Sequence, residues 1–178
     1  FMPADASDMP FDDAAFDLLV CQFGVMFFPD KVAGFREAQR VLRPGGHYLF
    51  STWDTMEENP FAALAHQVSG RIFPDDPPSF YQVPFSYADP SLVVADMEAA
   101  GWHEVTHQAV PLNKTVSDPG LFARGAVFGN PLIDEIRSRG DVAPETVASA
   151  LEDAFLATFG PAPFDMKLRA TVFSARRD

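Results

Sequence analysis

Three features are scarce in this sequence of 178 residues, and each scarcity excludes a class of protein. There is one cysteine, Cys21, so an internal disulfide is impossible, which fits a reducing cytoplasmic location. No apolar run approaches the roughly 20 residues of a transmembrane helix, so we expect no membrane partner. The 13 Lys and Arg residues stand against 25 Asp and Glu, and a net charge of −12 argues against a nucleic-acid partner.

Several motifs of nucleotide and metal sites are absent as well. No Gly-x-Gly run follows a predicted strand, because Gly24 is single and Gly45-Gly46 follows a predicted helix. The Tyr of a short-chain nicotinamide dehydrogenase needs a Lys four residues later, and no Tyr of this chain has one. His103 and His107 have no third ligand nearby, so we expect no metal site.

What the sequence does contain is enough apolar material for a core. Its hydrophobic fraction is 47% and its charged fraction 21%, which are values of an ordinary globular protein. A chain of this length can bury a core without disulfides. We therefore predict one domain over residues 1–178.

The hydrophobic pattern begins with a strand, a helix and a second strand. Phe16–Phe23 is apolar on both faces through Leu18–Cys21, which is typical of a parallel strand covered by helices on both sides. A helix is predicted from Asp30 to Arg43, ended by Pro44-Gly45-Gly46, and a strand over His47–Trp53. This order predicts a right-handed βαβ unit in an α/β sheet.

The rest of the chain alternates between helices and strands. We divide the whole chain into the βαβ unit (1–54), a lid helix and loop (55–90), and a C-terminal part (91–178) that carries a helical insertion at 118–160. The expected helices are 59–73, 89–101 and two or three pieces within 118–159, with a Pro-rich loop at 74–84. The expected strands are 102–112 and 166–176, the last antiparallel and partly exposed.

The linked motifs of the N-terminal third resemble a known family. They are Ala4-Asp5-Ala6, Met9-Pro10-Phe11, Phe16-Asp17, Cys21–Gly24 and Arg40–Gly46. In this order and spacing they are similar to class I S-adenosylmethionine-dependent methyltransferases of the ubiquinone-biosynthesis type. The resemblance is close over residues 1–54 and returns loosely at Ala99–Trp102. It implies a Rossmann-like α/β sheet, here partial and with an antiparallel last strand, plus a helical lid or insertion.

The resemblance also implies S-adenosylmethionine, or its product S-adenosylhomocysteine, as the cofactor. Asp5 would accept a hydrogen bond from the adenine amino group, and Ala6 would offer its backbone amide to the ring. Cys21, Gln22 and Phe23 would line the methionine end. The alternatives are that Asp5 is a turn residue and that Cys21 and Phe23 belong to the core. Cys21 is not expected to act as a nucleophile, since no cation is adjacent in sequence.

An apolar cluster around the second strand suggests the substrate. Met26, Phe27, Trp53 and Phe61 would line a pocket for a small apolar or aromatic molecule, and His66 lies on a helix that should cover it. The alternatives are a helix-entry contact for Met26 and Phe27 and a solvated His66. No residue is singled out as a general base, so the catalytic residue stays unknown.

The missing glycine turn leads to two expectations. The chain alone should not bind the cofactor with ordinary affinity, so it is inactive by itself if nothing supplies the turn. The strand 16–23 should be an exposed apolar edge that a missing N-terminal segment or a second copy covers. The competing function is a non-catalytic remnant of the fold that serves as a partner-binding or dimerisation domain.

Overall fold

The first strand–helix–strand unit forms as predicted in the computed structural model, which describes all of residues 1–178. Strand β1 (Phe16–Gln22), helix α1 (Lys31–Val41) and strand β2 (Leu42–Trp53) follow one another, and the two strands are parallel. Asp30 caps α1, because its carboxylate accepts a hydrogen bond of 2.8 Å from the amide of Ala33. The predicted βαβ unit is therefore confirmed.

The segment Pro44-Gly45-Gly46 was expected only to end a helix, and it does more than that. Helix α1 ends at Val41, and β2 already begins at Leu42. The pairing with β1 shifts between Phe16 and Leu18, which marks a bulge, and Gly45 has a φ of +83°. The Gly45 amide donates to the carbonyl of Arg177 at 2.8 Å, and the Arg177 amide donates to Gly46 at 2.8 Å. A distant strand thus supplies the partners that extend β2, which local sequence could not reveal.

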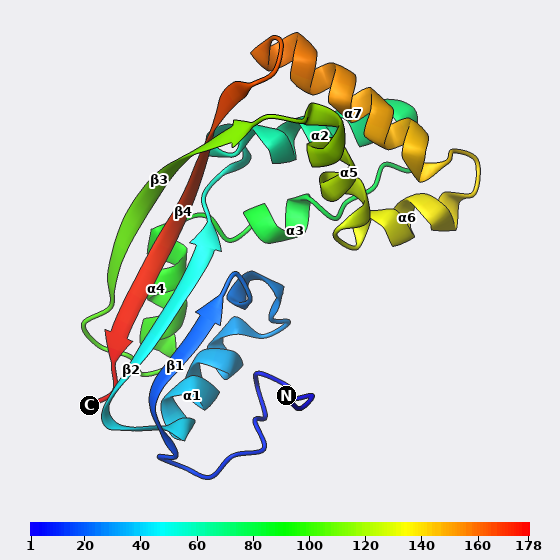
Figure 1. Ribbon diagram of the computed structural model, residues 1–178. Coiled ribbons are helices and arrows are strands. Elements are labelled where there is room, and N and C mark those ends of the chain that lie inside the picture. The colour runs from blue at the N-terminus through cyan, green and yellow to red at the C-terminus, as the bar shows by residue number, and fades with distance from the viewer. The chain divides into compact units, whose positions relative to one another are not determined.

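The sheet has four strands in the order β1-β2-β4-β3, as the arrows of Figure 1 show. Strand β4 (Phe164–Arg176) pairs antiparallel with β2, which confirms the prediction for the last strand. Strand β3 (Thr106–Val116) begins later than the predicted Trp102. Glu104 has a φ of +54°, which breaks the extended backbone just before the strand.

The chain divides into two compact units, which we describe separately. Unit 1 comprises residues 1–54, 84–110 and 170–178, and unit 2 comprises residues 55–83 and 111–169. Strands β3 and β4 each contribute residues to both units. The single domain and its three sections inferred from the sequence stay predictions.

Unit 1 packs two helices on one face of its sheet. Helix α4 (Pro90–Ala99) starts at Asp89, whose carboxylate accepts from the amide of Ser91, and it packs beside α1. The buried residues of this core include Phe35, Ala38, Tyr48, Phe50, Val93, Met97, Trp102 and Phe173. The indole nitrogen of Trp102 donates to the carbonyl of Phe35 at 2.9 Å, which satisfies the polar atom of a fully buried ring.

The opposite face of this sheet corrects the expectation of helices on both sides. Leu18 and Val20 of β1 are each 56% exposed, and Leu49 of β2, which pairs with Val20, is 39% exposed. No helix of unit 1 contributes to this face, because α1 and α4 both belong to the core on the other one. Strand β1 is also the end of the sheet, so the predicted apolar edge is confirmed.

Unit 2 is built around a long helix. Helix α7 (Pro144–Phe159) packs against α2 (Pro60–Ile72) and α5 (Pro119–Phe128), and α6 (Leu132–Arg139) joins them. The helical pieces and the breaks near Asn130 and Gly140 agree with the prediction. The loop 74–84 ends in the short helix α3 (Gln82–Phe85), and Arg139 ties this loop down by an ion pair of 3.1 Å with Asp76. No helix of the chain has the length and apolar character that crossing a bilayer requires.

Candidate cofactor site and a cavity in unit 2

A surface hollow of about 670 Å³ in unit 1 holds the first two predicted cofactor residues. Two segments line it, Pro3–Ser7 and Phe27–Asp30. Asp5 and Ala6 therefore face Phe27, whose side chain is 48% exposed and forms an apolar wall. The structure thus brings together two segments that lie on either side of strand β1 in the sequence.

The carboxylate of Asp5 is held in one orientation. Its Oδ1 accepts hydrogen bonds from the amide of Ser7 at 2.8 Å and from the Ser7 hydroxyl at 2.7 Å. These two bonds lower the pKa of Asp5, so the group is ionised at neutral pH. The second oxygen, Oδ2, makes no hydrogen bond with the protein. An acceptor therefore stands beside the Ala6 amide, the donor that the resemblance invokes.

An arginine on α1 holds the following segment in place. Arg40 donates to the carbonyls of Met9 (3.0 Å) and Phe11 (2.8 Å) and forms an ion pair of 2.6 Å with Asp13. Glu37 pairs with Arg40 at 2.6 Å and accepts from the Met9 amide at 2.8 Å. The planar guanidinium can serve several acceptors at once, so this pair fixes the loop that leads from Asp5 to β1.

Cys21 lies on the core face of β1 and lines a cavity that shares Ala6 with the hollow around Asp5. It lines a cavity of about 220 Å³ together with Ala6, Phe28 and Tyr48. Burial raises the pKa of its thiol, against the smaller opposite effect of hydrogen bonds from the Gly24 amide and the Tyr48 hydroxyl. The thiol is therefore neutral at pH 7, which fits the expectation that Cys21 is no nucleophile.

Gln22 and Phe23 take different directions from Cys21. Gln22 faces the open side of the sheet, where it lines a hollow of about 330 Å³ with Val20 and Leu49. Phe23 has a left-handed backbone with a φ of +53°, which is unusual for a bulky residue, and its ring stacks on Trp53. Asp5, Ala6 and Cys21 thus line neighbouring cavities of unit 1, whereas Gln22 opens to another surface.

The predicted substrate residues are divided between the two units. Met26 is buried in the core of unit 1, where Val25–Phe27 forms a short 3₁₀ helix, while Phe27 and Trp53 are partly exposed. Phe61 and His66 lie on α2 in unit 2. The Nδ1 atom of His66 is buried without a hydrogen-bond partner, and its Nε2 lies 3.4 Å from the side-chain amide of Gln82.

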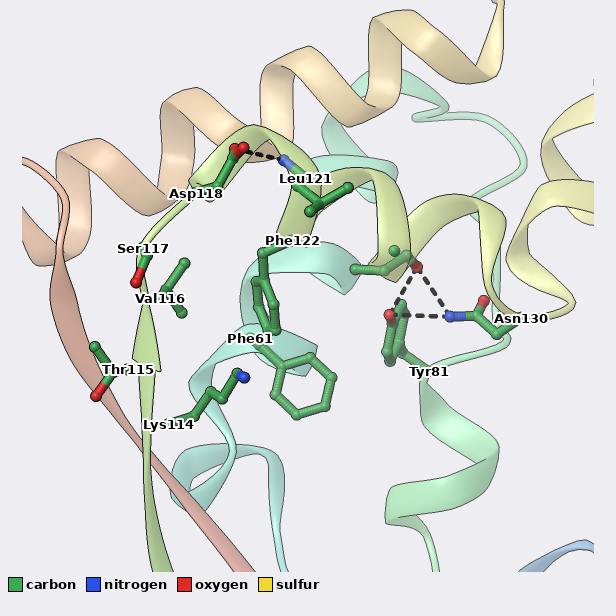
Figure 2. Close-up of a pocket in the computed structure, with 12 residues that line it drawn as sticks. Phe61, Tyr81, Lys114, Thr115, Val116, Ser117, Asp118, Leu121, Phe122 and Asn130 are labelled. Carbon is green, nitrogen blue, oxygen red and sulfur yellow. Dashed lines mark hydrogen bonds between the residues drawn. The ribbon is translucent and has the colours of Figure 1, made fainter.

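Unit 2 contains a cavity of about 560 Å³ of which the sequence indicated only Phe61. Strand β3, helix α5 and the aromatic residues Phe61, Tyr81 and Phe122 form its wall (Figure 2). The hydroxyl of Tyr81 donates to the carbonyl of Ala126 at 2.8 Å, and burial raises its pKa to about 12. No sequence pattern indicated this cavity, because its lining comes from segments far apart in the chain. Leu121, one of the lining residues, is 68% exposed.

Comparison with known proteins relates the N-terminal part of the chain to a family. Residues 1–50 match the family described as Methyltransferase domain, and this range contains Asp5, Ala6 and Cys21. Over this range the chain is similar to the class I S-adenosylmethionine-dependent methyltransferases. The Rossmann-like sheet and the order of motifs agree with that assignment.

Relatives of this chain include enzymes of quinone biosynthesis. It is 30% identical over 122 residues to the ubiquinone/menaquinone biosynthesis C-methyltransferase of Idiomarina loihiensis, covering 61% of this chain and 47% of the relative. It is 32% identical over 111 residues to the demethylmenaquinone methyltransferase of Mycolicibacterium vanbaalenii, covering 57% and 49%. The chain thus spans about half the length of the curated relatives it matches.

Solved structures support the methyltransferase fold. A Bacillus halodurans protein assigned as a methyltransferase has a TM-score of 0.55 and 20% identity, covering 99% of this chain and 76% of its own. The YcgJ protein of Bacillus subtilis has a TM-score of 0.50 and 19% identity, covering 97% and 68%. At these identities the likeness establishes the fold alone.

Proposed function

We propose that this chain provides part of the active site for methyl transfer from S-adenosylmethionine to a small apolar or aromatic acceptor. The observation that carries the proposal is the hollow in which the carboxylate of Asp5 and the amide of Ala6 stand beside the exposed ring of Phe27. The similarity to methyltransferases of ubiquinone and menaquinone biosynthesis supports an apolar aromatic acceptor.

The residues present fit one end of the cofactor. An adenine ring offers an exocyclic amine and a ring nitrogen side by side, and these match the free oxygen of Asp5 and the amide of Ala6. Because Asp5 is ionised and pinned by Ser7, its acceptor is ready before any ligand arrives. The Phe27 ring supplies an apolar surface for the flat face of a base.

The cofactor supplies a methyl group that is already activated on a sulfonium, so the protein mainly has to bind, orient and exclude water. The N-terminal segment, held by Arg40 and Glu37, orients the purine side. Burial raises the pKa of Cys21 and of Tyr48, so both side chains stay protonated and uncharged. The cavity that they line with Ala6 and Phe28 therefore carries no charge, which favours the exclusion of water. No side chain of unit 1 is assigned as a base.

The other half of the cofactor site belongs to the proposal as well. A glycine-rich turn and an acid for the ribose are missing from residues 1–178. We propose that a segment outside residues 1–178 supplies them, since the chain spans about half the length of the relatives it matches. That segment would also cover β1, and on this proposal the isolated chain is inactive.

Calorimetric titration of the full-length natural protein with S-adenosylhomocysteine tests this function. Asp5→Ala removes the acceptor and should weaken binding about tenfold, as expected for a hydrogen bond to a charged group. Asp12→Ala removes another exposed acid of the same segment and should change nothing. Equal affinities of the wild type and Asp5→Ala would place the purine elsewhere.

The second candidate function is a non-catalytic domain that binds a partner. The open edge of β1 and the exposed Leu18 and Val20 favour it, because an unpaired apolar edge strand tends to recruit another chain. The same calorimetry separates the two functions. No binding of S-adenosylhomocysteine by the full-length protein, together with stable self-association, would favour this reading.

A further inference from the structure

We infer that the cavity of unit 2 is a binding site for a small aromatic monoanion, such as an aromatic carboxylate. This inference does not depend on the proposed methyl transfer, because every lining residue belongs to unit 2. The cavity measures about 560 Å³, within the range of pockets that hold small organic molecules.

Three aromatic rings set the shape of the cavity. The ring of Phe61 meets that of Tyr81 edge to face, with centroids 6.1 Å apart, and that of Phe122 at 6.2 Å. Phe122 in turn packs on the fully buried Phe155 at 5.4 Å, which fixes its position. Rigid rings at right angles to one another form a slot that suits a flat apolar ligand.

The polar atoms of the far wall are already satisfied. Tyr81 and Asn130 both donate to the carbonyl of Ala126, at 2.8 and 2.9 Å (Figure 2). Asn130 also accepts from the amide of Leu132 at 3.0 Å. Tyr81 is neutral, since burial raises its pKa to about 12. This wall therefore offers a ligand apolar surface and no charge.

The other side of the cavity carries a basic residue, Lys114 of β3. Its ammonium group has no hydrogen bond or ion pair within the protein, and Figure 2 shows it directed toward the ring of Phe61. The other charged lining residue is Asp118, whose carboxylate accepts from the amide of Leu121 at 2.8 Å and caps α5. A cation without a partner beside an aromatic slot favours an anionic ligand, and the nearby Asp118 disfavours a second negative charge.

The glycines of two helices provide matched variants for the test. A Cβ at Gly125, which lines the cavity on α5, meets no atom within 4 Å, and the same holds for Gly70 on α2, outside the cavity. Gly125→Met therefore adds a side chain to the cavity wall with a Cβ that meets no other atom, and Gly70→Met makes the same change elsewhere in the unit. Both replacements introduce a better helix former, so loss of folding is not expected.

Binding of 2-naphthoate to the whole chain is measured by calorimetry, with uncharged 2-naphthamide as the neutral probe. We expect saturable one-to-one binding of 2-naphthoate, a loss of at least about tenfold in Gly125→Met and no change in Gly70→Met. Lys114→Met should weaken 2-naphthoate about tenfold and leave 2-naphthamide unchanged, while Lys114→Arg retains binding. Lys167→Met, which removes another lysine of unit 2, should have no effect.

Two results would overturn the inference. One is the absence of saturable 2-naphthoate binding by the wild type up to about 1 mM. The other is equal affinity of Gly125→Met and Gly70→Met, which would place the probe outside the cavity. Weakening of both probes by Lys114→Met would also contradict the role of its charge, since only the carboxylate probe should respond.

Discussion

The rings of Phe23 and Trp53 stack with centroids 4.3 Å apart and 15° between their planes. The two residues follow β1 and end β2, so the contact joins the two parallel strands where they finish. It depends on the left-handed backbone of Phe23, whose amide donates to the hydroxyl of Ser51 at 3.2 Å. Such strained positions concentrate at functional sites, which fits the place of Phe23 beside the candidate cofactor residues.

A double-mutant cycle on this pair should measure its contribution. We expect Phe23→Leu and Trp53→Leu to be coupled by about 0.5–1.5 kcal/mol in the free energy of unfolding, as stacked aromatic pairs are. Urea denaturation followed by circular dichroism gives the four values. Strictly additive effects would mean that the stack contributes only the burial of its two rings.

The predictability of this region differs from residue to residue. The apolar run Leu18–Cys21 predicted strand β1, although Leu18 and Val20 are exposed, and Pro44-Gly45-Gly46, predicted to end the helix, lies within β2. No sequence pattern predicted the left-handed backbone conformation of Phe23. In that conformation the Phe23 amide donates a hydrogen bond to Ser51, which lies 28 residues away.

The candidate sites show the same limit. The cavity of unit 2 is lined by residues from α2, the loop before α3, β3 and α5, and Asn59 joins distant segments in a similar way. The side chain of Asn59 donates to the carbonyl of Arg169 and accepts from the amide of Arg169, in each case at 3.0 Å, although the two residues lie 110 positions apart in the sequence. Such sites depend on contacts between segments far apart in the chain, so hydrophobic periodicity and secondary-structure propensity do not predict them. The family motif singled out Asp5 and Ala6, which line one hollow, and their role in cofactor binding stays a prediction.

Two glycine substitutions should change stability in opposite directions. A Cβ at Gly34 would lie 2.6 Å from Cδ2 of Phe28, so Gly34→Ala must displace that ring and should destabilise unit 1 by about 1–3 kcal/mol. Gly125→Ala meets no atom within 4 Å and should stabilise α5 by about 0.5–1 kcal/mol. Urea denaturation of both variants checks the pair. A stable Gly34→Ala protein would mean that Phe28 can move at little cost.

The interaction of Glu37 with Arg40 and Met9 should make stability depend on pH. The hydrogen bond from Arg40 lowers the pKa of Glu37 below its ordinary 4.5. A lowered pKa in the folded state means that the contribution is complete above about pH 4.5 and is lost as the pH falls through the folded-state value. The stability difference between the wild type and Glu37→Gln should therefore be present at neutral pH and shrink in acid.

Thermal unfolding of both proteins at neutral pH and at roughly pH 3.5 measures this difference. The exposed Glu98 of α4 provides the control, because Glu98→Gln should shift the melting temperature little at either pH. A difference for Glu37→Gln that stays constant across the pH range would show that packing, and not ionisation, is responsible.

The open face and edge of β1 should make the chain of 178 residues self-associate. Leu18 is 56% exposed on a strand whose outer edge has no partner, and the neighbouring Val20 is equally exposed. Leu18→Lys places a charge on this surface, which disfavours pairing, and should cost the monomer less than about 0.5 kcal/mol because the side chain is not buried. Leu92→Lys, on the exposed side of α4 where leucine is 46% accessible, serves as the matched control.

Sedimentation velocity should show a concentration-dependent dimer or larger species for the wild type and for Leu92→Lys, and a monomer for Leu18→Lys. A wild type that stays monomeric at all concentrations would mean that this edge does not recruit a second copy, and it would leave an N-terminal segment as the proposed cover for the strand.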